Sequence, residues 1–193
     1  MGKSASKTAG RLFSLLPISA NQITVLSVLL AFLGFASAFL GQHLLALCLF
    51  VLSGAADAID GAVARFRNEA SARGAYIDGI SDRLVEFAFL CSFLAYSLPA
   101  FPIPALYSVI LFLFFGSCMT GFATAYADHR KVADSKKISL QPGFLPRAER
   151  LILLFIAFAL IPFAPYLTSF LLFAGALLCA LTFFQRFAYF ASK

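Results

Sequence analysis

The sequence predicts an all-α integral membrane protein with six transmembrane helices and an N-terminal helix on the cytoplasmic surface. Of its 193 residues, 61% are hydrophobic and 12% are charged, and the mean hydropathy is +0.90. Soluble domains carry about 25% charged residues, so this composition excludes a water-soluble protein. Six spans of about 20 residues each occupy most of the chain. We therefore expect residues 1–193 to form a single membrane domain.

The basic residues predict which ends of the spans face the cytoplasm. All 15 fall into four clusters, at 3–11, 65–83, 130–150 and 186–193. The connections at 41–43, 98–104 and 162–166 contain none. By the positive-inside rule, the clusters face the cytoplasm and the three uncharged connections face outward. We therefore expect a multi-pass protein of the cell membrane with both termini, and its polar chemistry, on the cytoplasmic side.

The first elements are a surface helix and a span. Residues 1–20 mix basic with apolar side chains, which is typical of an amphipathic helix lying on a membrane, and Pro17 ends that helix. The first span is expected at 21–40, where Asn21 and Thr24 are candidates to cap its start.

Five further spans follow. They are expected at 43–65, 74–98, 105–127, 148–161 and 166–187. Pro162 limits the fifth span, since proline interrupts helical hydrogen bonding. Residues 128–147 form the largest loop, which is basic.

Four of the nine acidic residues lie close together in this apolar chain: Asp57, Asp60, Asp78 and Asp82. Helical spacing places the first two on one face of the second span and the last two on one face of the third. The short loop makes these spans antiparallel neighbours, so both acidic faces lie at the cytoplasmic end. An acid at membrane depth is costly and usually functional.

Carboxylates that converge in this way repel one another unless a cation separates them. All-oxygen ligands with open positions suit Mg²⁺ or Mn²⁺ together with a phosphate. Gly61 and Gly74 leave room for a phosphate or nucleotide near the backbone, and Arg65 can reach a phosphate oxygen. Two metal ions could clamp the reacting oxygens, or one carboxylate could accept a proton. A salt-bridged cluster of these acids with Arg65, Arg73 and Arg83 is the structural alternative.

A cation or proton transporter is a functional alternative. It would need polar residues along a path across the membrane. The outward connections carry no charged residue, and the polar residues gather at one side. The sequence therefore favours chemistry at the cytoplasmic surface.

At this point the sequence resembles the CDP-alcohol phosphotransferases. It matches every position of their signature: Asp57-x-x-Asp60-Gly61-x-x-Ala64-Arg65, eight residues, Gly74, three residues, Asp78, three residues, Asp82. The resemblance covers nearly the whole chain. Asn21-Gln22-Ile23-Thr24 resembles the family's Asn-x-x-Thr element, although Ala20 stands where proline is common.

The resemblance implies transfer of a phosphoryl-alcohol group from a CDP-linked donor to a hydroxyl, with release of CMP. By that analogy Asp57, Asp60 and Asp78 ligate metal, and Asp82 lies at a second metal and acts as the general base. CDP would be held by Asp57, Gly61, Ala64, Arg65 and Gly74. The implied cofactors are two ions of Mg²⁺ or Mn²⁺, and the implied assembly is a homodimer packed through spans away from the site.

The acceptor is predicted by resemblances outside the acidic stretch. The pair Asp82-Arg83 resembles members with phosphorylated polyol acceptors. Pro146-Arg147-Ala148-Glu149-Arg150 resembles the R-x-E-R element of inositol-phosphate and glycerol-phosphate members. Candidate ligands of an acceptor phosphate are Arg130, Lys131, Arg147 and Arg150. The alternative is that these are ordinary positive-inside charges.

The resemblance thus favours a phosphatidyl- or archaetidyl-inositol-phosphate synthase. Its donor would be a CDP-linked membrane lipid that enters from the cytoplasmic leaflet, and its acceptor inositol phosphate. Glycerol phosphate or serine as acceptor, and CDP-inositol or CDP-choline as donor, remain open. No nucleic-acid partner is expected.

Overall fold

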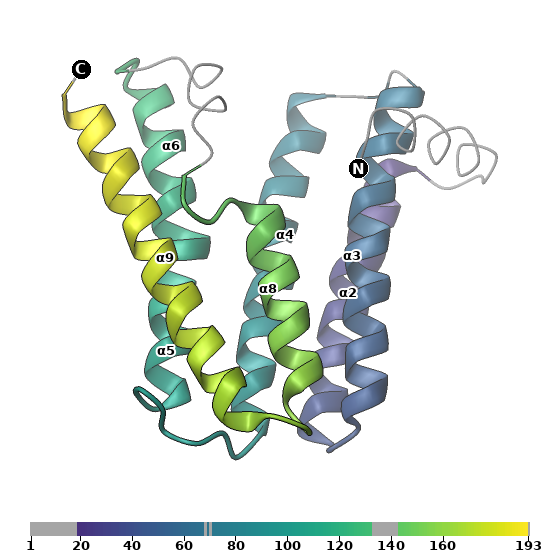
Figure 1. Ribbon diagram of the computed structural model, residues 1–193. Helices are drawn as coiled ribbons and strands as arrows, with labels where there is room; N and C mark the ends of the chain where they lie inside the picture. The colour runs from purple at the N-terminus through teal and green to yellow at the C-terminus, as the bar shows by residue number, and fades with distance from the viewer. Residues whose placement is uncertain (1–18, 68, 70, 133–142, 193) are drawn as a thin grey trace. The chain divides into compact units, whose positions relative to one another are not determined.

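The computed structural model describes residues 19–67, 69, 71–132 and 143–192, and within these ranges all regular secondary structure is helical (Figure 1). The predicted surface helix of residues 1–20 lies almost entirely outside the described residues. The chain divides into two compact units, Met1–Ser92 and Phe93–Lys193. Each unit is described by itself.

The described part of the first unit contains three long helices: α2 (Ala20–Phe39), α3 (His43–Phe66) and α4 (Ala72–Ser92). Helix α2 packs against both α3 and α4. At Gly34, an added Cβ would lie 3.2 Å from the Phe50 ring and 3.3 Å from Ala46 O, so glycine permits the close approach of α2 and α3. Phe50 in turn stacks on Phe89 of α4, with ring centroids 4.3 Å apart.

A pair of serines joins α2 to α3 in the interior of this unit. Ser53 Oγ donates to Ser27 O at 2.8 Å, and Ser27 Oγ lies 3.1 Å from Ser53 O. Both side chains are buried. In a membrane, such hydroxyls need partners from neighbouring helices because lipid offers none.

The second unit contains these elements: η1 (Phe93–Ala95), α5 (Ala105–Leu111), η2 (Phe112–Met119), α6 (Thr120–His129), α8 (Arg147–Leu160) and α9 (Pro165–Ala191). Helix α5, the π-helical segment η2 and α6 follow one another without a break. Helix α9 packs against α5, η2, α6 and α8. Gly175 permits this packing, because a Cβ there would lie 2.4 Å from the Phe112 ring.

Side chains of the second unit hydrogen-bond to the backbone in and beside η2. Arg150 Nη1 donates to Gly116 O at 2.9 Å, and the Thr120 hydroxyl donates to Phe115 O. Arg186 Nη1 lies 3.3 Å from Thr120 O and 3.0 Å from Thr124 Oγ1. A π-helical turn shifts the backbone hydrogen bonds out of the α-helical pattern, and these side chains add hydrogen bonds to carbonyls in and beside it.

Among the described residues, four stretches are long and apolar enough to cross a membrane: α2, α3, Ala105–His129 and α9. The other two predicted spans correspond to α4 and α8. Helix α4 carries five charged residues: Arg73, Asp78, Asp82, Arg83 and Glu86. Helix α8 has 14 residues, or about 21 Å at a rise of 1.5 Å per residue, against about 30 Å for the hydrocarbon core. The structure therefore supports an all-helical protein with four candidate spans.

Candidate functional site

The start of α2 is fixed by a capping box. Ser19 N–H donates to Gln22 Oε1 at 2.8 Å, and Gln22 N–H donates to Ser19 Oγ at 3.3 Å. The prediction that Asn21 or Thr24 caps this helix is therefore wrong. The S-x-x-Q pattern of a capping box is present in the sequence and could have identified Ser19. Asn21 and Thr24 instead line a cavity.

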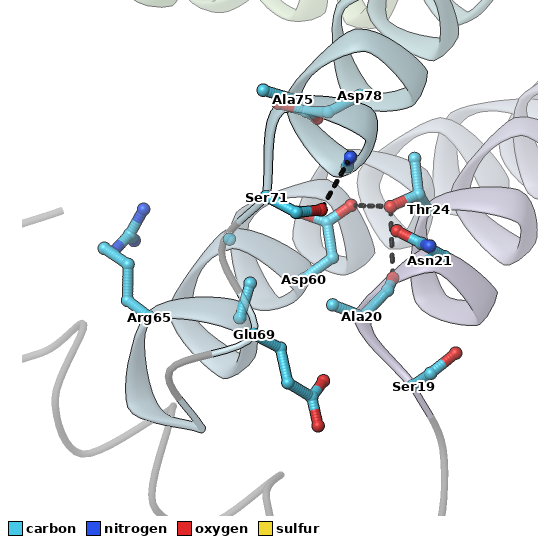
Figure 2. A pocket seen from close by; sticks show the side chains of 13 residues that line it. Ser19, Ala20, Asn21, Thr24, Asp60, Arg65, Glu69, Ser71, Ala75 and Asp78 are labelled. Carbon is cyan, nitrogen blue, oxygen red and sulfur yellow. Dashed lines mark hydrogen bonds between the residues drawn. The ribbon is translucent and has the colours of Figure 1, made fainter.

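This cavity lies in the first unit, where the start of α2, the end of α3 and the start of α4 meet (Figure 2). Its volume is about 280 Å³, close to the lower end of the range of about 300–1,000 Å³ for ligand pockets. The lining residues are Ser19, Ala20, Asn21, Thr24, Asp60, Gly61, Ala64, Arg65, Glu69, Ser71, Gly74, Ala75 and Asp78.

Three carboxylates form a potential metal site beside the cavity. Oxygen atoms of Asp57, Asp60 and Asp78 all lie within 4.8 Å of one another. On one octahedral Mg²⁺, neighbouring ligand oxygens are about 3.0 Å apart and opposite ones about 4.2 Å, so the three side chains would move closer together to share one ion. Carboxylate oxygens are the ligands that Mg²⁺ and Mn²⁺ favour. The donor set therefore fits a divalent cation.

Asp60 is the most buried of the three carboxylates and accepts a hydrogen bond from a side chain of α2. It is 4% exposed. Thr24 Oγ1 lies 2.6 Å from Asp60 Oδ2 and 3.1 Å from Ala20 O. Figure 2 shows the Thr24 and Asp60 side chains directed at each other from α2 and α3.

Other groups around the cavity suit an anion. Gly74 N–H donates to Ser71 Oγ at 3.0 Å, an N-cap contact at the start of α4. The first residues of α2 and α4 line the cavity, and helix N-termini attract negative charge. Arg65 adds a guanidinium, whose Nη1 lies 3.2 Å from the position of a Cβ on Gly61. A cavity with carboxylates and anion-attracting groups suits a metal-bound phosphate.

The structure brings together most of the residues predicted for metal and CDP. Gly61, Ala64, Arg65 and Gly74 line the cavity with Asp60 and Asp78, and Asp57 joins these two acids in the three-carboxylate group. Asp82 lies one turn beyond Asp78 on α4 and is 9% exposed. Within the described part of the chain, it is outside that group.

The four residues predicted to bind an acceptor phosphate belong to the second unit. Arg130 places its guanidinium carbon 5.8 Å from the centroid of the Tyr126 ring. Lys131 has a φ of 57° and is exposed. Arg147 is the first residue of α8. Arg150 is 4% exposed and donates to Gly116 O.

Some polar residues near the site were missed by reasoning from the sequence. Glu69 and Ser71 line the cavity. Ser71 could have been recognised, because serine followed by a helix is a common N-cap. Glu86 continues the spacing of four residues that runs through Asp78 and Asp82, and it is 1% exposed. That spacing was visible in the sequence.

Solved structures of a Mycobacterium tuberculosis phosphatidylinositol phosphate synthase have a similar fold. The structure with manganese and citrate gives a TM-score of 0.71 at 22% identity, covering 97% of this chain and 89% of that chain. The structure with CDP-DAG bound gives 0.70 at 22% identity, covering 97% and 94%. At this identity the likeness concerns the fold.

Curated relatives are similar in sequence. An archaetidylinositol phosphate synthase of Pyrococcus horikoshii is 28% identical over 179 residues, which are 92% of this chain and 86% of that protein. A bifunctional IPC transferase and DIPP synthase of Thermococcus kodakarensis is 36% identical over 107 residues, which are 55% of this chain and 24% of that protein. The family model for CDP-alcohol phosphatidyltransferase matches residues 17–184. The chain therefore belongs to the CDP-alcohol phosphatidyltransferase family.

Proposed function

We propose that this enzyme transfers a phosphatidyl or archaetidyl group from a CDP-linked lipid to a hydroxyl of inositol phosphate and releases CMP. The observation that carries the proposal is the cavity in which Gly61, Ala64, Arg65 and Gly74 lie together with Asp60 and Asp78. The name of the Pyrococcus horikoshii relative, an archaetidylinositol phosphate synthase, supports inositol phosphate as the acceptor.

In this proposal Asp57, Asp60 and Asp78 hold Mg²⁺ or Mn²⁺, and Asp82 lies at a second ion. When bound, the ions neutralise the pyrophosphate and stabilise the charge on the CMP leaving group. Asp57, Gly61, Ala64, Arg65 and Gly74 hold the CDP portion. Glycine at 61 and 74 lets the pyrophosphate approach the backbone, while Arg65 and the starts of α2 and α4 bind its oxygens.

Asp82 is the proposed general base. Its carboxylate accepts the proton of the acceptor hydroxyl while that oxygen forms a bond to the phosphorus attached to the lipid. The bond from this phosphorus to the oxygen of CMP breaks, and CMP leaves with the bonding electrons. The burial of Asp82, which is 9% exposed, keeps bulk water from competing as an acceptor.

The phosphate of the acceptor is assigned to Arg130, Lys131, Arg147 and Arg150. Arg147 is the leading candidate because it begins α8 and is partly exposed. Arg150 is more enclosed and donates one hydrogen bond to Gly116 O, so its part in phosphate binding is secondary to its role in the fold. Guanidinium groups suit phosphate binding since they contact phosphate oxygens in pairs.

For the membrane arrangement we propose six spans in a single domain, with α4 and α8 added to the four candidates. The charged residues of α4 then face the site rather than lipid, in keeping with the burial of Asp82 and Glu86. The proposal also includes a surface helix within residues 1–20. Both termini and the site lie on the cytoplasmic side. Two copies form a homodimer that is packed through spans away from the site. The distribution of basic residues supports the orientation.

The test is an assay of purified protein with Mn²⁺ or Mg²⁺. CDP-diacylglycerol and CDP-archaeol are offered with inositol phosphate, glycerol phosphate, serine or free inositol, and products are identified by mass spectrometry. The proposal expects CMP release and a phosphorylated inositol lipid. If a product forms with glycerol phosphate or serine but not with inositol phosphate, then that compound is the acceptor. Turnover only with CDP-inositol or CDP-choline would contradict the lipid donor.

A further inference from the structure

We propose that Thr24 is a positioning residue for Asp60, holding this carboxylate in the orientation that binds the divalent cation. The inference rests on the proposed function, in which Asp60 is a metal ligand. All residues of the family signature lie on α3, on α4 or in the loop between them. The inference gives a residue of α2 a role in metal binding as well. Thr24 does not touch the cation in this proposal; it acts through Asp60.

The Thr24 hydroxyl has two acceptors within reach but only one proton. Asp60 Oδ2 lies 2.6 Å away and Ala20 O lies 3.1 Å away. Hydrogen bonds to a carboxylate are shorter and stronger than those to a neutral carbonyl. The shorter distance and the charge both assign the proton to Asp60. In a helix threonine is restricted to two rotamers about its first side-chain bond, and the one present here directs the hydroxyl at Asp60.

This contact leaves part of the carboxylate available. A carboxylate offers about four lone-pair positions on its two oxygens. Thr24 occupies one of them on Oδ2 and the backbone N–H of Gly61 takes a second, which leaves about two for a cation near Asp57 and Asp78. Hydrogen bonds of this kind orient metal ligands in proteins, and their loss commonly weakens metal binding.

The backbone that carries Thr24 is fixed at both sides. The capping box of Ser19 and Gln22 holds the helix start. One turn further into the helix, the bond from Ser53 Oγ to Ser27 O ties α2 to α3 and does not depend on the Ser27 side chain. Thr24 is itself 4% exposed. The hydroxyl is therefore held relative to Asp60 before any cation binds, which is the arrangement that a preorganised site requires.

A purely structural role is the competing explanation, in which Thr24 only satisfies a buried carboxylate. Three variants separate the two roles. Thr24→Val removes the donor at nearly constant shape, and Thr24→Ser keeps the donor. The matched control is Ser27→Ala, which removes a buried α2–α3 hydrogen bond of 3.1 Å without changing a cavity residue.

The measurement is Mn²⁺ binding to purified protein, followed by electron paramagnetic resonance of the unbound ion, together with thermal unfolding in EDTA. We expect Thr24→Val to weaken Mn²⁺ affinity about 10- to 100-fold. Thr24→Ser and Ser27→Ala should bind like the parent. The Mn²⁺ concentration for half-maximal activity should rise with Thr24→Val, while kcat at saturating Mn²⁺ should recover.

Three results would overturn the inference. Parental Mn²⁺ affinity in Thr24→Val would do so while leaving the proposed function intact. An equal loss of Mn²⁺ affinity in Ser27→Ala would show that any weakening of the α2–α3 contact lowers the affinity. Unfolding of Thr24→Val in EDTA, with Ser27→Ala folded, would assign Thr24 to the fold. Absence of Mn²⁺ binding by the parent would instead contradict the metal site itself.

Discussion

Asp60 in the first unit and Arg150 in the second are buried to the same extent, at 4% exposed each, yet their surroundings differ. Asp60 borders a cavity, and two other carboxylates lie within 4.8 Å. Arg150 donates to the backbone carbonyl of Gly116 in a π-helical segment. A buried charge in an apolar chain can thus serve a ligand or serve the fold. The neighbours of that charge distinguish the two roles.

The largest expected effect is on activity at Asp60. Asp60→Asn removes a metal-ligand charge, and metal ions supply several kcal/mol of transition-state stabilisation, so activity should fall by about 10³-fold or more. Stability in EDTA should be retained, since one of three mutually repelling carboxylates is neutralised. CMP release and thermal unfolding measure the two effects. Asp128→Asn, at an exposed acid of α6, is the matched control, and an equal loss there would undermine the comparison.

Asp82→Asn should leave metal binding by the three-carboxylate group intact but lower kcat. Removal of a general base commonly costs about 10²- to 10⁴-fold. The KM for the CDP-linked donor should change less than kcat, because the three-carboxylate group remains and Mn²⁺ in excess keeps the second site filled. Steady-state kinetics with Mn²⁺ in excess check this. Full activity of this variant would remove Asp82 from its proposed role.

Arg147→Gln tests whether a charged side chain of the second unit binds the acceptor phosphate. Loss of a hydrogen bond to a charged group costs about 1.5–3 kcal/mol, so the KM for inositol phosphate should rise about 10- to 100-fold. The KM for an unphosphorylated acceptor such as serine or free inositol, where turnover is detectable, should not change. Equal increases for both kinds of acceptor would mean that Arg147 does not bind the acceptor phosphate.

Arg150→Met should chiefly affect stability. The substitution leaves Gly116 O without its guanidinium donor, and an unsatisfied buried acceptor costs about 1–3 kcal/mol. The melting temperature in EDTA should fall, whereas Arg147→Gln should leave it near the parental value. An unchanged melting temperature in Arg150→Met would show that the fold does not depend on this contact.

The smallest effect is expected from two glycine substitutions. A Cβ on Gly61 would lie 3.2 Å from Arg65 Nη1, whereas a Cβ on Gly79 would meet nothing within 4 Å. Gly61→Ala should raise the donor KM severalfold by displacing Arg65 and crowding the pyrophosphate. Gly79→Ala should leave the kinetics unchanged and stabilise α4 by up to about 1 kcal/mol. Equal donor KM values for the two variants would argue against CDP binding at Gly61.

The sequence predicted the helices and the grouping of three of the four acids well, for physical reasons. Apolar runs ended by glycine or proline mark helices clearly, and α3 (His43–Phe66) lies at the predicted 43–65. The spacing of Asp57, Asp60 and Asp78 placed them on facing helices, because helical periodicity is regular. Their grouping within 4.8 Å agrees with that expectation.

Contacts between distant segments were beyond the sequence. Thr24 and Asp60 are 36 positions apart, and nothing in a local pattern pairs a hydroxyl of α2 with a carboxylate of α3. Arg150 likewise looks like any basic residue at the entrance of a span, and its bond to Gly116 O depends on the π-helical segment. Local spacing therefore predicted the acids, but not the partners that orient or enclose them.

The central claim is that the carboxylates of the first unit bind a divalent cation while the buried arginine of the second supports the fold. A Mn²⁺ titration of the purified parent, Asp60→Asn and Arg150→Met, each confirmed to be folded, tests it most directly. We predict saturable binding by the parent and by Arg150→Met, and loss of binding by Asp60→Asn. Parental affinity in Asp60→Asn, or its loss in folded Arg150→Met, would contradict the claim.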